Sequence, residues 1–424
     1  MKVVRTGILI KPDRKRVVLK PFNITDGRIN KIISRILSLS EKDVRKELKT
    51  VLNDFDERHR EIRQFFFNRY EQLEKYLRTD QQISEKRKLL IGAYFTNEYS
   101  LEAAALFNPS IVWAPDQSGL TKSSTRFILA LRAVGEGHIS SIVFTSGIIN
   151  KNNVIRIDRR SKYVTNPNKI KDCLQDNSNL IYEIEYSEDI PLSERMIFPH
   201  SSSEINGIED ARFVEFYDEN GQRTYYATYT AYDGKTIRPQ ILETKDFLQF
   251  KISFLTGIEV KNKGMALFPR KISGQYVMLS RQDNENIYLM YSHELNTWNE
   301  KQLLAEPKYS WEFVQLGNCG SPIETDEGWL VISHSVDAMR RYTIGAFLLD
   351  KDDPSKIIGR LRKPLLTANK KEREGYVPNV VYSCGSLVNK GELIIPFAMS
   401  DYASSFAKVN LNELLSELKS HYKK

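Results

Sequence analysis

The chain has 424 residues, of which 41% are hydrophobic and 27% are charged, a composition typical of an ordinary globular protein. This length suggests two or three domains, although folds built from repeated units place more residues in one body. Lys and Arg outnumber Asp and Glu by 62 to 54, a net charge of +8. Such a mild excess favours a solubilising surface over an anionic partner such as nucleic acid.

Cysteine spacing and hydropathy exclude further classes. Cys173, Cys319 and Cys384 lie too far apart in the sequence for a disulfide framework or a Cys-rich metal site. No apolar run approaches the roughly 20 residues that span a bilayer. Residues 1–11 lack the apolar region and cleavage site of a signal peptide. We expect no membrane span and a cytoplasmic protein, or a periplasmic one if a signal peptide has been removed.

A helical pattern dominates the first hundred residues. From Ser40 to Leu77, apolar side chains recur every three or four residues, which predicts one long amphipathic helix with Ser40 as its N-cap. Charges of both signs fill its other face, which favours a helix packed against the main body. The alternative is a self-association helix, which would make the protein a homo-oligomer through its N-terminal helices.

After residue 106 the pattern changes to short apolar or aromatic runs separated by Gly, Asn and Asp, the residues of hairpin turns. Five such hairpins recur, which predicts a five-bladed β-propeller more than a β-sandwich, whose strands recur at shorter intervals. We therefore expect an all-β fold, with an α-helical N-terminal extension at 1–105 and the propeller at 106–424. The five predicted strand pairs are 111–113 with 126–132, 213–217 with 224–232, 266–272 with 275–281, 321–323 with 329–334, and 386–388 with 392–400.

Polar side chains gather where the second strand of each pair ends. Carboxylates, Arg, His and Asn in one cleft are what sugar chemistry requires, although each residue alone could be structural or part of a solvated turn. The adjacent carboxylates Glu209 and Asp210 precede one strand, and Asn108 and Ser110 lie near another. The strand-end residues are Arg132, Thr230 with Asp233, Arg281, His334 and Asp401.

Motifs of other enzyme classes are missing from the sequence. There is no HExxH metal motif, no Walker loop and no GxSxG nucleophile motif. Basic residues are scattered, without a basic and aromatic strand motif for nucleic acid. We therefore expect no metal, no organic cofactor and no nucleic-acid partner.

Seven segments in the second part of the chain carry a family likeness: Asn108–Ser110, LALRA at 129–133, GIEDAR at 207–212, NKGMALFP at 262–269, GWLVISH at 328–334, IGAFLLDKDDP at 344–354 and GYVPNVV at 375–381. In these segments the sequence resembles glycoside hydrolase family 130, the β-mannoside phosphorylases and β-mannosidases. The likeness runs from about residue 106 to the C-terminus, and it implies a five-bladed β-propeller and a β-mannoside oligosaccharide substrate.

The resemblance also implies roles for individual residues. The family's proposed catalytic acid is the Asp of the ED-x-R loop, here Asp210, which would protonate the glycosidic oxygen of an inverting reaction. The mannose before the scissile bond would be held by Asn108, Ser110, Arg132 and Asp401, and we place Glu209 with these substrate-binding residues.

The nucleophile distinguishes the two branches of the family. In the phosphorylases, inorganic phosphate is held by an Arg-Asn pair, a second Arg, a Lys and a His. These positions fall on Lys263–Gly264, Arg281, Gln315 and His334, so one cation and one amide donor are lost. Lys cannot grip phosphate with two parallel hydrogen bonds as Arg does. This loss favours water as the nucleophile, activated by Glu312 or Glu374 as general base.

The leading hypothesis from the sequence is an exo-acting, inverting β-mannosidase acting on β-1,2-linked mannosides by hydrolysis. The first alternative is a β-mannoside phosphorylase that releases mannose 1-phosphate, with phosphate as co-substrate. The second alternative is a non-catalytic mannoside-binding propeller that uses the same residues.

Overall fold

The computed structural model describes residues 1–77, 82–173 and 179–420. These divide into two compact units, which are described separately. A helical unit comprises residues 13–102 and 161–166, and a β unit comprises 1–12, 103–160 and 167–424. Residues 1–12, which the sequence analysis placed in the N-terminal extension, thus belong to the β unit. Within the described residues, no helix is long and apolar enough to cross a membrane.

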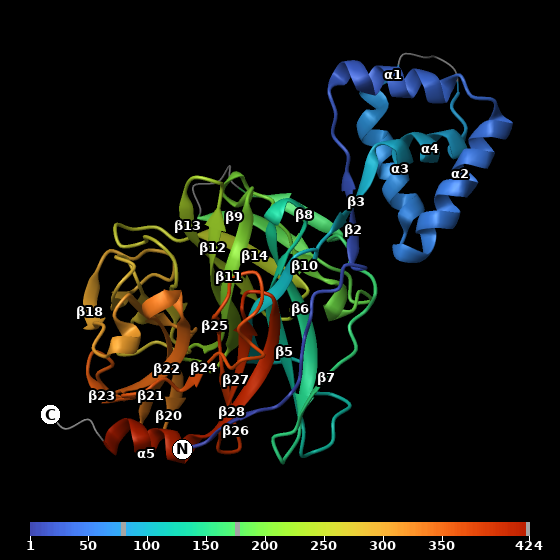
Figure 1. The fold of residues 1–424 in the computed structure, drawn as a ribbon. Coiled ribbons are helices and arrows are strands. Elements are labelled where there is room, and N and C mark those ends of the chain that lie inside the picture. The colour runs from blue at the N-terminus through green and yellow to red at the C-terminus, as the bar shows by residue number, and fades with distance from the viewer. Residues whose placement is uncertain (78–81, 174–178, 421–424) are drawn as a thin grey trace. The chain divides into compact units, whose positions relative to one another are not determined.

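The helical unit packs four helices around one apolar core (Figure 1). The prediction of a single long helix from Ser40 is wrong, because the chain breaks after Phe55 and Glu61 adopts a left-handed backbone with φ of 51°. Ser40 is confirmed as an N-cap, since its hydroxyl accepts a hydrogen bond from the Asp43 amide. The elements are α1 (Asp26–Leu37), α2 (Glu41–Phe55), α3 (Ile62–Leu73) and α4 (Glu85–Tyr94), with β2 (Val17–Pro21) paired to β3 (Thr96–Ser100).

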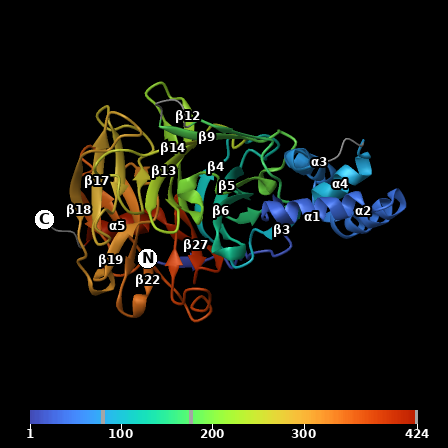
Figure 2. The same cartoon turned by 90° about the horizontal axis from the view of Figure 1, so that it is seen from above.

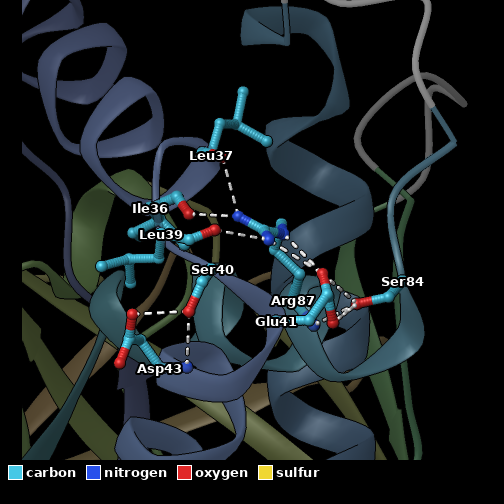
Figure 3. Close-up of polar contacts among 8 residues, drawn as sticks. All are labelled: Ile36, Leu37, Leu39, Ser40, Glu41, Asp43, Ser84 and Arg87. Atoms are coloured by element: carbon cyan, nitrogen blue, oxygen red, sulfur yellow. Dashed lines mark hydrogen bonds and ion pairs between the residues drawn. The ribbon is translucent and has the colours of Figure 1, made fainter.

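Arg87 of α4 joins three parts of this unit (Figure 3). Its guanidinium donates to the carbonyl oxygens of Ile36, Leu37 and Leu39, at 2.6, 2.8 and 2.8 Å, where α1 ends. It also pairs with Glu41 at the start of α2, at 2.8 Å. The last carbonyls of a helix lack partners within the helix, so this buried arginine satisfies groups that would otherwise destabilise the fold.

The β unit contains all five predicted hairpins as antiparallel strand pairs. The first two groups of strands form one sheet, joined where β6 and β11 meet in parallel at a single residue pair. The first group is β4 (Ala105–Trp113), β5 (Thr125–Val134), β6 (Ser140–Ile149), β7 (Ile155–Ile157) and β10 (Met196–Ile197). The second is β11 (Gly207–Tyr217), β12 (Arg223–Tyr232), β13 (Ile237–Thr244), β14 (Gln249–Phe254), β9 (Leu180–Glu185) and β8 (Lys169–Asp172).

The other three groups are separate sheets, and β1 pairs with β28, which joins the first residues of the chain to the last sheet. In Figure 2, β17 and β18 lie at one end of this unit and β6 lies toward the other. The third group is β15 (Ala266–Leu267), β16 (Tyr276–Ser280), β17 (Ile287–Ser292) and β18 (Lys301–Ala305). The fourth is β19 (Gln315–Asn318), β20 (Ile323–Thr325), β21 (Gly328–Val336), β22 (Tyr342–Leu349), β23 (Ile357–Arg360) and β24 (Leu366–Thr367). The fifth is β1 (Val3–Arg5), β25 (Val381–Tyr382), β26 (Leu387–Asn389), β27 (Glu392–Met399) and β28 (Ala403–Asn410), followed by α5 (Leu411–Ser420).

Two strand pairings are interrupted at residues that were predicted to belong to the site. The pairing of β4 with β5 slips between Phe107 and Ser110, and that of β11 with β12 slips between Glu209 and Arg212. Asn108 and Asp210 lie in these bulges with left-handed backbones, at φ of 49° and 54°. Asn and Asp tolerate this conformation better than most residues, and a bulge turns a side chain away from the regular alternation of the strand.

Candidate active site

The two bulges bring Asn108 and Asp210 together. Asn108 Nδ2 donates to Asp210 Oδ1 at 2.7 Å, and Arg132 Nη1 of β5 donates to the same oxygen at 3.2 Å. The second branch of the Arg132 guanidinium donates to Glu209 Oε1 at 2.8 Å. Lys263 Nζ completes the group with a 2.5 Å bond to Glu209 Oε2. The structure thus places five of the predicted site residues in one network of alternating charge.

The cations of this network control the ionisation of Asp210. Burial alone would raise the pKa of Asp210, but Arg132, Arg212 and the hydrogen bond from Asn108 outweigh burial and hold the pKa below its usual value. Asp401 behaves in the opposite way. Burial and the nearby negative charge of Asp210 raise the pKa of Asp401 to about 6, against the opposing effect of Arg132. Asp210 is therefore ionised when the site holds no substrate, and Asp401 titrates near neutral pH.

A second cluster beside Asp210 consists of buried cations. Arg212 Nη1 donates to the Asp210 carbonyl oxygen at 3.0 Å, and its Nη2 donates to the Tyr382 hydroxyl at 2.6 Å. Arg281, only 8% exposed, donates from Nη1 to His334 Nε2 at 3.2 Å. The Nε atoms of Arg212 and Arg281 have no hydrogen-bond partner among the described residues. Each of the two guanidinium groups therefore keeps one buried N–H that no described group accepts.

Gly264 leaves space next to these two arginines. Its φ of 88° is a conformation that favours glycine. The position that a Cβ would occupy on Gly264 lies 4.0 Å from both Arg212 Nη2 and Arg281 Nε. The side chain missing at residue 264 therefore leaves a small space beside two cationic groups, which we call the recess at Gly264.

His334 belongs to the same cluster, and it is a neutral base there. Burial, together with Arg281 and Arg212, lowers its pKa well below the usual value. Its Nδ1 lies 3.0 Å from the Asn318 carbonyl oxygen, so we assign the proton to Nδ1 and the lone pair to Nε2, which accepts from Arg281. Gln315 Nε2 is 3.4 Å from the same ring nitrogen. His334 thus orients Arg281 and Gln315 rather than supplying a positive charge.

Several predicted residues lie in structural positions. Ser110 is buried, and its hydroxyl accepts the Phe213 amide at 2.9 Å. Asp233 accepts the amides of the turn that follows it, and Thr230 is buried in β12 beside Glu209. The structure does not join these three side chains to the Asp210 network by a described hydrogen bond.

The two predicted general bases are not brought to the cluster. Glu312 is 1% exposed, and its carboxylate pairs with Arg360 at 2.8 Å and accepts the amides of Lys308 and Tyr309 at 2.7 and 2.9 Å. It therefore caps a short helical turn. Glu374 is exposed in the loop before β25. Neither position supports the base role expected from the sequence.

Sequence reasoning missed Arg212, Tyr382 and Asn318. Arg212 stood in the quoted GIEDAR segment, two residues after the predicted acid, and this motif was the one available signal for its role. Tyr382 lies in β25 of the fifth strand group, and Asn318 lies in β19 with Gln315; their described hydrogen bonds to the cluster run to Arg212, Gly264 and His334. No group of three or more His, Cys, Asp or Glu side chains suited to a metal occurs in the described part of the chain.

Comparison with known proteins identifies the family. A family model for glycoside hydrolase family 130, described as beta-1,4-mannooligosaccharide phosphorylase, matches residues 183–420. A 1,2-beta-oligomannan phosphorylase from Thermoanaerobacter sp. (strain X514) is 32% identical over 219 residues, covering 50% of this chain and 72% of that protein. A beta-1,2-mannobiose phosphorylase from the same strain is 32% identical over 266 residues, covering 58% of this chain and 82% of that protein.

Structural comparison agrees on the fold. The complex of a beta-1,2-mannobiose phosphorylase from Listeria innocua with beta-1,2-mannobiose superposes with a TM-score of 0.54 at 22% identity, covering 75% of this chain and 93% of that chain. Three-quarters of this chain therefore shares the fold of that enzyme. Because the family model matches more than half of this chain, the chain belongs to glycoside hydrolase family 130.

Proposed function

We propose that the protein is a β-mannoside phosphorylase that transfers a terminal mannose from a β-1,2-linked mannoside to inorganic phosphate. The observation that carries this proposal is the recess at Gly264, where Arg212 and Arg281 each have an Nε without a described partner. Charge-assisted hydrogen bonds from planar guanidinium groups suit phosphate oxygens. The relatives named above are phosphorylases of β-1,2-linked mannosides, which supports the choice of linkage.

The reaction would proceed in one displacement. A phosphate oxygen held by Arg212 and Arg281 attacks C1 of the mannose, and the bond from C1 to the glycosidic oxygen breaks on the opposite face. The glycosidic oxygen takes the electron pair and a proton from Asp210, directly or through a sugar hydroxyl. The products are α-mannose 1-phosphate and a mannoside shorter by one residue.

Phosphate would also prepare the acid. The pKa of Asp210 is low in the empty site because neighbouring cations stabilise its carboxylate. Bound phosphate adds negative charge beside Arg212 and Arg281 and offsets their effect, so the pKa of Asp210 rises and the residue can hold the proton it must donate.

Hydrolysis is the second candidate, although it was the leading expectation from the sequence. Its support is the replacement of a phosphate-binding Lys by Gln315 and of an Arg by Lys263, whose ammonium pairs with Glu209. An inverting hydrolase also needs a carboxylate base on the opposite side of C1 from its acid. Glu312 is held in a cap by Arg360, so the position predicted for that base does not favour hydrolysis.

We further propose that the five strand groups are the blades of a propeller. Strands of all five groups supply the two clusters. They are β4 and β5, β11, β16, β19 and β21, and β25, which lie at or next to Asn108, Arg132, Asp210, Arg281, Gln315, His334 and Tyr382. Convergence of successive blades on one axis would explain how residues so far apart in sequence meet.

A phosphate-dependence assay tests the proposal. Purified protein is incubated with β-1,2-mannobiose, with and without inorganic phosphate, and products are separated by chromatography. We expect α-mannose 1-phosphate and mannose only when phosphate is present. Two equivalents of mannose without phosphate would establish hydrolysis instead. Glu312→Gln provides a second comparison: a hydrolase with this base would lose turnover, whereas a phosphorylase would keep it in the folded fraction.

A further inference from the structure

A cavity of about 370 Å³ lies in the β unit at the opposite ends of the strands that support the catalytic cluster. Asn108 is near the start of β4, and Trp113 of the cavity is at its end. Asp210 is near the start of β11, and Tyr217 of the cavity is at its end. At about 3.3 Å per residue, these strand ends lie roughly 16–23 Å from Asn108 and Asp210, and the nearest lining residues, Ile111 and Phe213, lie about 10 Å from them. No residue of the Asp210 network lines the cavity, so its lining is distinct from that of the candidate active site.

All five strand groups contribute to its wall. The side chains and backbone that line it belong to the ends of β4 and β11, to the turn after β15, and to the segments that begin β20 and β26. Its volume lies in the range of pockets that hold small molecules and is large enough for several water molecules.

Two buried hydroxyls in this wall have unmet hydrogen-bonding capacity. The Oγ atoms of Ser321 and Ser386 are hidden from solvent and have no partner among the described residues. Buried hydroxyls are almost always paired, with protein or with an ordered molecule in the cavity. A polar occupant of the cavity that both donates and accepts hydrogen bonds would therefore satisfy the two serines.

The charged groups of the wall are balanced. Arg270 and Glu324 form a two-pronged ion pair at 2.9 and 2.8 Å, and both side chains are partly exposed. Glu215 accepts the Tyr217 hydroxyl at 2.8 Å and Arg223 at 3.1 Å. Each carboxylate retains lone pairs for a further donor. With Arg223 behind the wall counted as the partner of Glu215, the two ion pairs carry no net charge, which favours a neutral occupant.

Aromatic and proline side chains complete the wall. Trp113 is partly exposed, Tyr217 is 44% exposed, and Pro269 and Pro322 line the same cavity. Aromatic side chains with an apolar face and a polar end suit ligands that present both C–H and O–H groups. This combination, with neutral polar groups, is what a pyranose ring requires.

We propose that this cavity is a second, non-catalytic binding site for a neutral saccharide of one or two sugar units. The ring would lie against Trp113 or Tyr217, and its hydroxyls would pair with Ser321, Ser386 and the free lone pairs of Glu324 and Glu215. The inference goes beyond the proposed function, since it concerns binding on the far side of the β unit and needs no turnover.

Isothermal titration of an Arg132→Ala variant tests the site, because this substitution weakens sugar binding at the candidate active site. The probes are mannose, β-1,2-mannobiose and glucose. We expect one saturable event for at least one probe in Arg132→Ala, and loss of that event when Ser386→Leu, which fills the cavity, is added. Ser118→Leu, at an exposed serine outside the cavity, is the matched control and should leave the event unchanged.

A second, milder variant tests the site even if Ser386→Leu fails to fold. Tyr217→Ala at an exposed ring should weaken binding by about three- to tenfold, the value of one aromatic contact. Absence of binding by all three probes in Arg132→Ala would overturn the proposal, as would binding that neither cavity variant alters. Crystals soaked in the binding sugar should show it at Ser321 and Ser386, and solvent alone there would also overturn the proposal. Because none of these readouts uses phosphate, failure of the phosphorylase assay would leave the outcome interpretable.

Discussion

Two buried arginines, one in each unit, differ in what surrounds the guanidinium. Arg87 in the helical unit donates to three carbonyl oxygens and a carboxylate, so its charge and its hydrogen-bonding groups are used within the fold (Figure 3). Arg281 in the β unit is equally buried, at 8%, but meets a neutral histidine and keeps its Nε without a described partner. Burial and charge are the same in both places, and the unmet donor is what distinguishes a candidate binding site.

The same contrast separates two carboxylates. Glu312 is saturated by Arg360 and two amides, as a structural group should be. Asp210 is held by Asn108 and Arg132 on one oxygen and stands at the edge of the cationic recess. A carboxylate can exchange a proton with a substrate only where its partners leave room for that substrate.

The largest effect on kcat is expected for substitution of Asp210, the proposed catalytic acid. Asp210→Asn should lower kcat for phosphorolysis of β-1,2-mannobiose by about 10²- to 10⁴-fold, the usual contribution of a general acid. An aryl mannoside whose leaving group needs no proton should lose much less. Steady-state kinetics measures both, with Asp326→Asn, at an exposed turn, as the control. Equal losses for the two substrates would argue against an acid role for Asp210.

Substitution of Arg281, whose Nε has no described partner, is expected to weaken the binding of phosphate specifically. Arg281→Gln removes a charged donor while retaining an amide, so the KM for phosphate should rise by about 10- to 150-fold, equivalent to roughly 1.5–3 kcal/mol. The KM for mannobiose should change little. Arg126→Gln, at a partly exposed arginine at the opposite end of β5 from Arg132, is the control. An unchanged phosphate KM would remove the recess from the proposed mechanism.

Substitution of Arg87, whose guanidinium is hydrogen-bonded within the fold, should lower the stability of the protein and leave its activity unchanged. Arg87→Met leaves the α1 carbonyls and Glu41 without their donor, and we expect the free energy of unfolding of the helical unit to fall by about 2–4 kcal/mol. Denaturation followed by circular dichroism measures this change, with exposed Arg45→Met as the control. A change in the phosphate KM of the folded variant would break the distinction between the two kinds of arginine.

The smallest effect concerns pH. Asp401, with a pKa raised to about 6, is neutral below that pH and an anion above it. An ionised acceptor binds sugar hydroxyls more strongly, so kcat/KM should fall by about fivefold as pH drops through 6. Asp401→Asn should lose this limb of the pH profile, and Asp326→Asn should keep it.

Unfolding provides a second readout for Asp401. The folded protein retains a proton between about pH 4 and 6 that the unfolded chain, with the ordinary pKa of 3.8, releases. The contribution of Asp401 to the free energy of unfolding is therefore present at low pH and is lost as pH rises through 6. A pH dependence of unfolding that Asp401→Asn leaves unaltered would contradict the environment described for this residue.

Local chemistry made much of the molecule predictable. The five hairpins follow from Asn, Asp and Gly between apolar runs, and the cap at Ser40 follows from its hydroxyl before a helical pattern. The single long helix was mispredicted because apolar spacing continues across the break at Glu61, where only the backbone turns. The spacing of apolar residues indicates which face of a helix is apolar, but it does not indicate whether the helix axis continues.

Residue types at short spacing were enough to predict the hairpins and the family likeness, and that likeness implied the candidate acid. The roles of Glu312 as a cap, of Arg212 and Tyr382 in the cluster and of Gly264 beside two arginines became visible in the folded chain. Hydrogen-bond saturation is a property of neighbours from distant strands, so no local pattern records it. That property separates a buried charge that stabilises the fold from one that is available to phosphate.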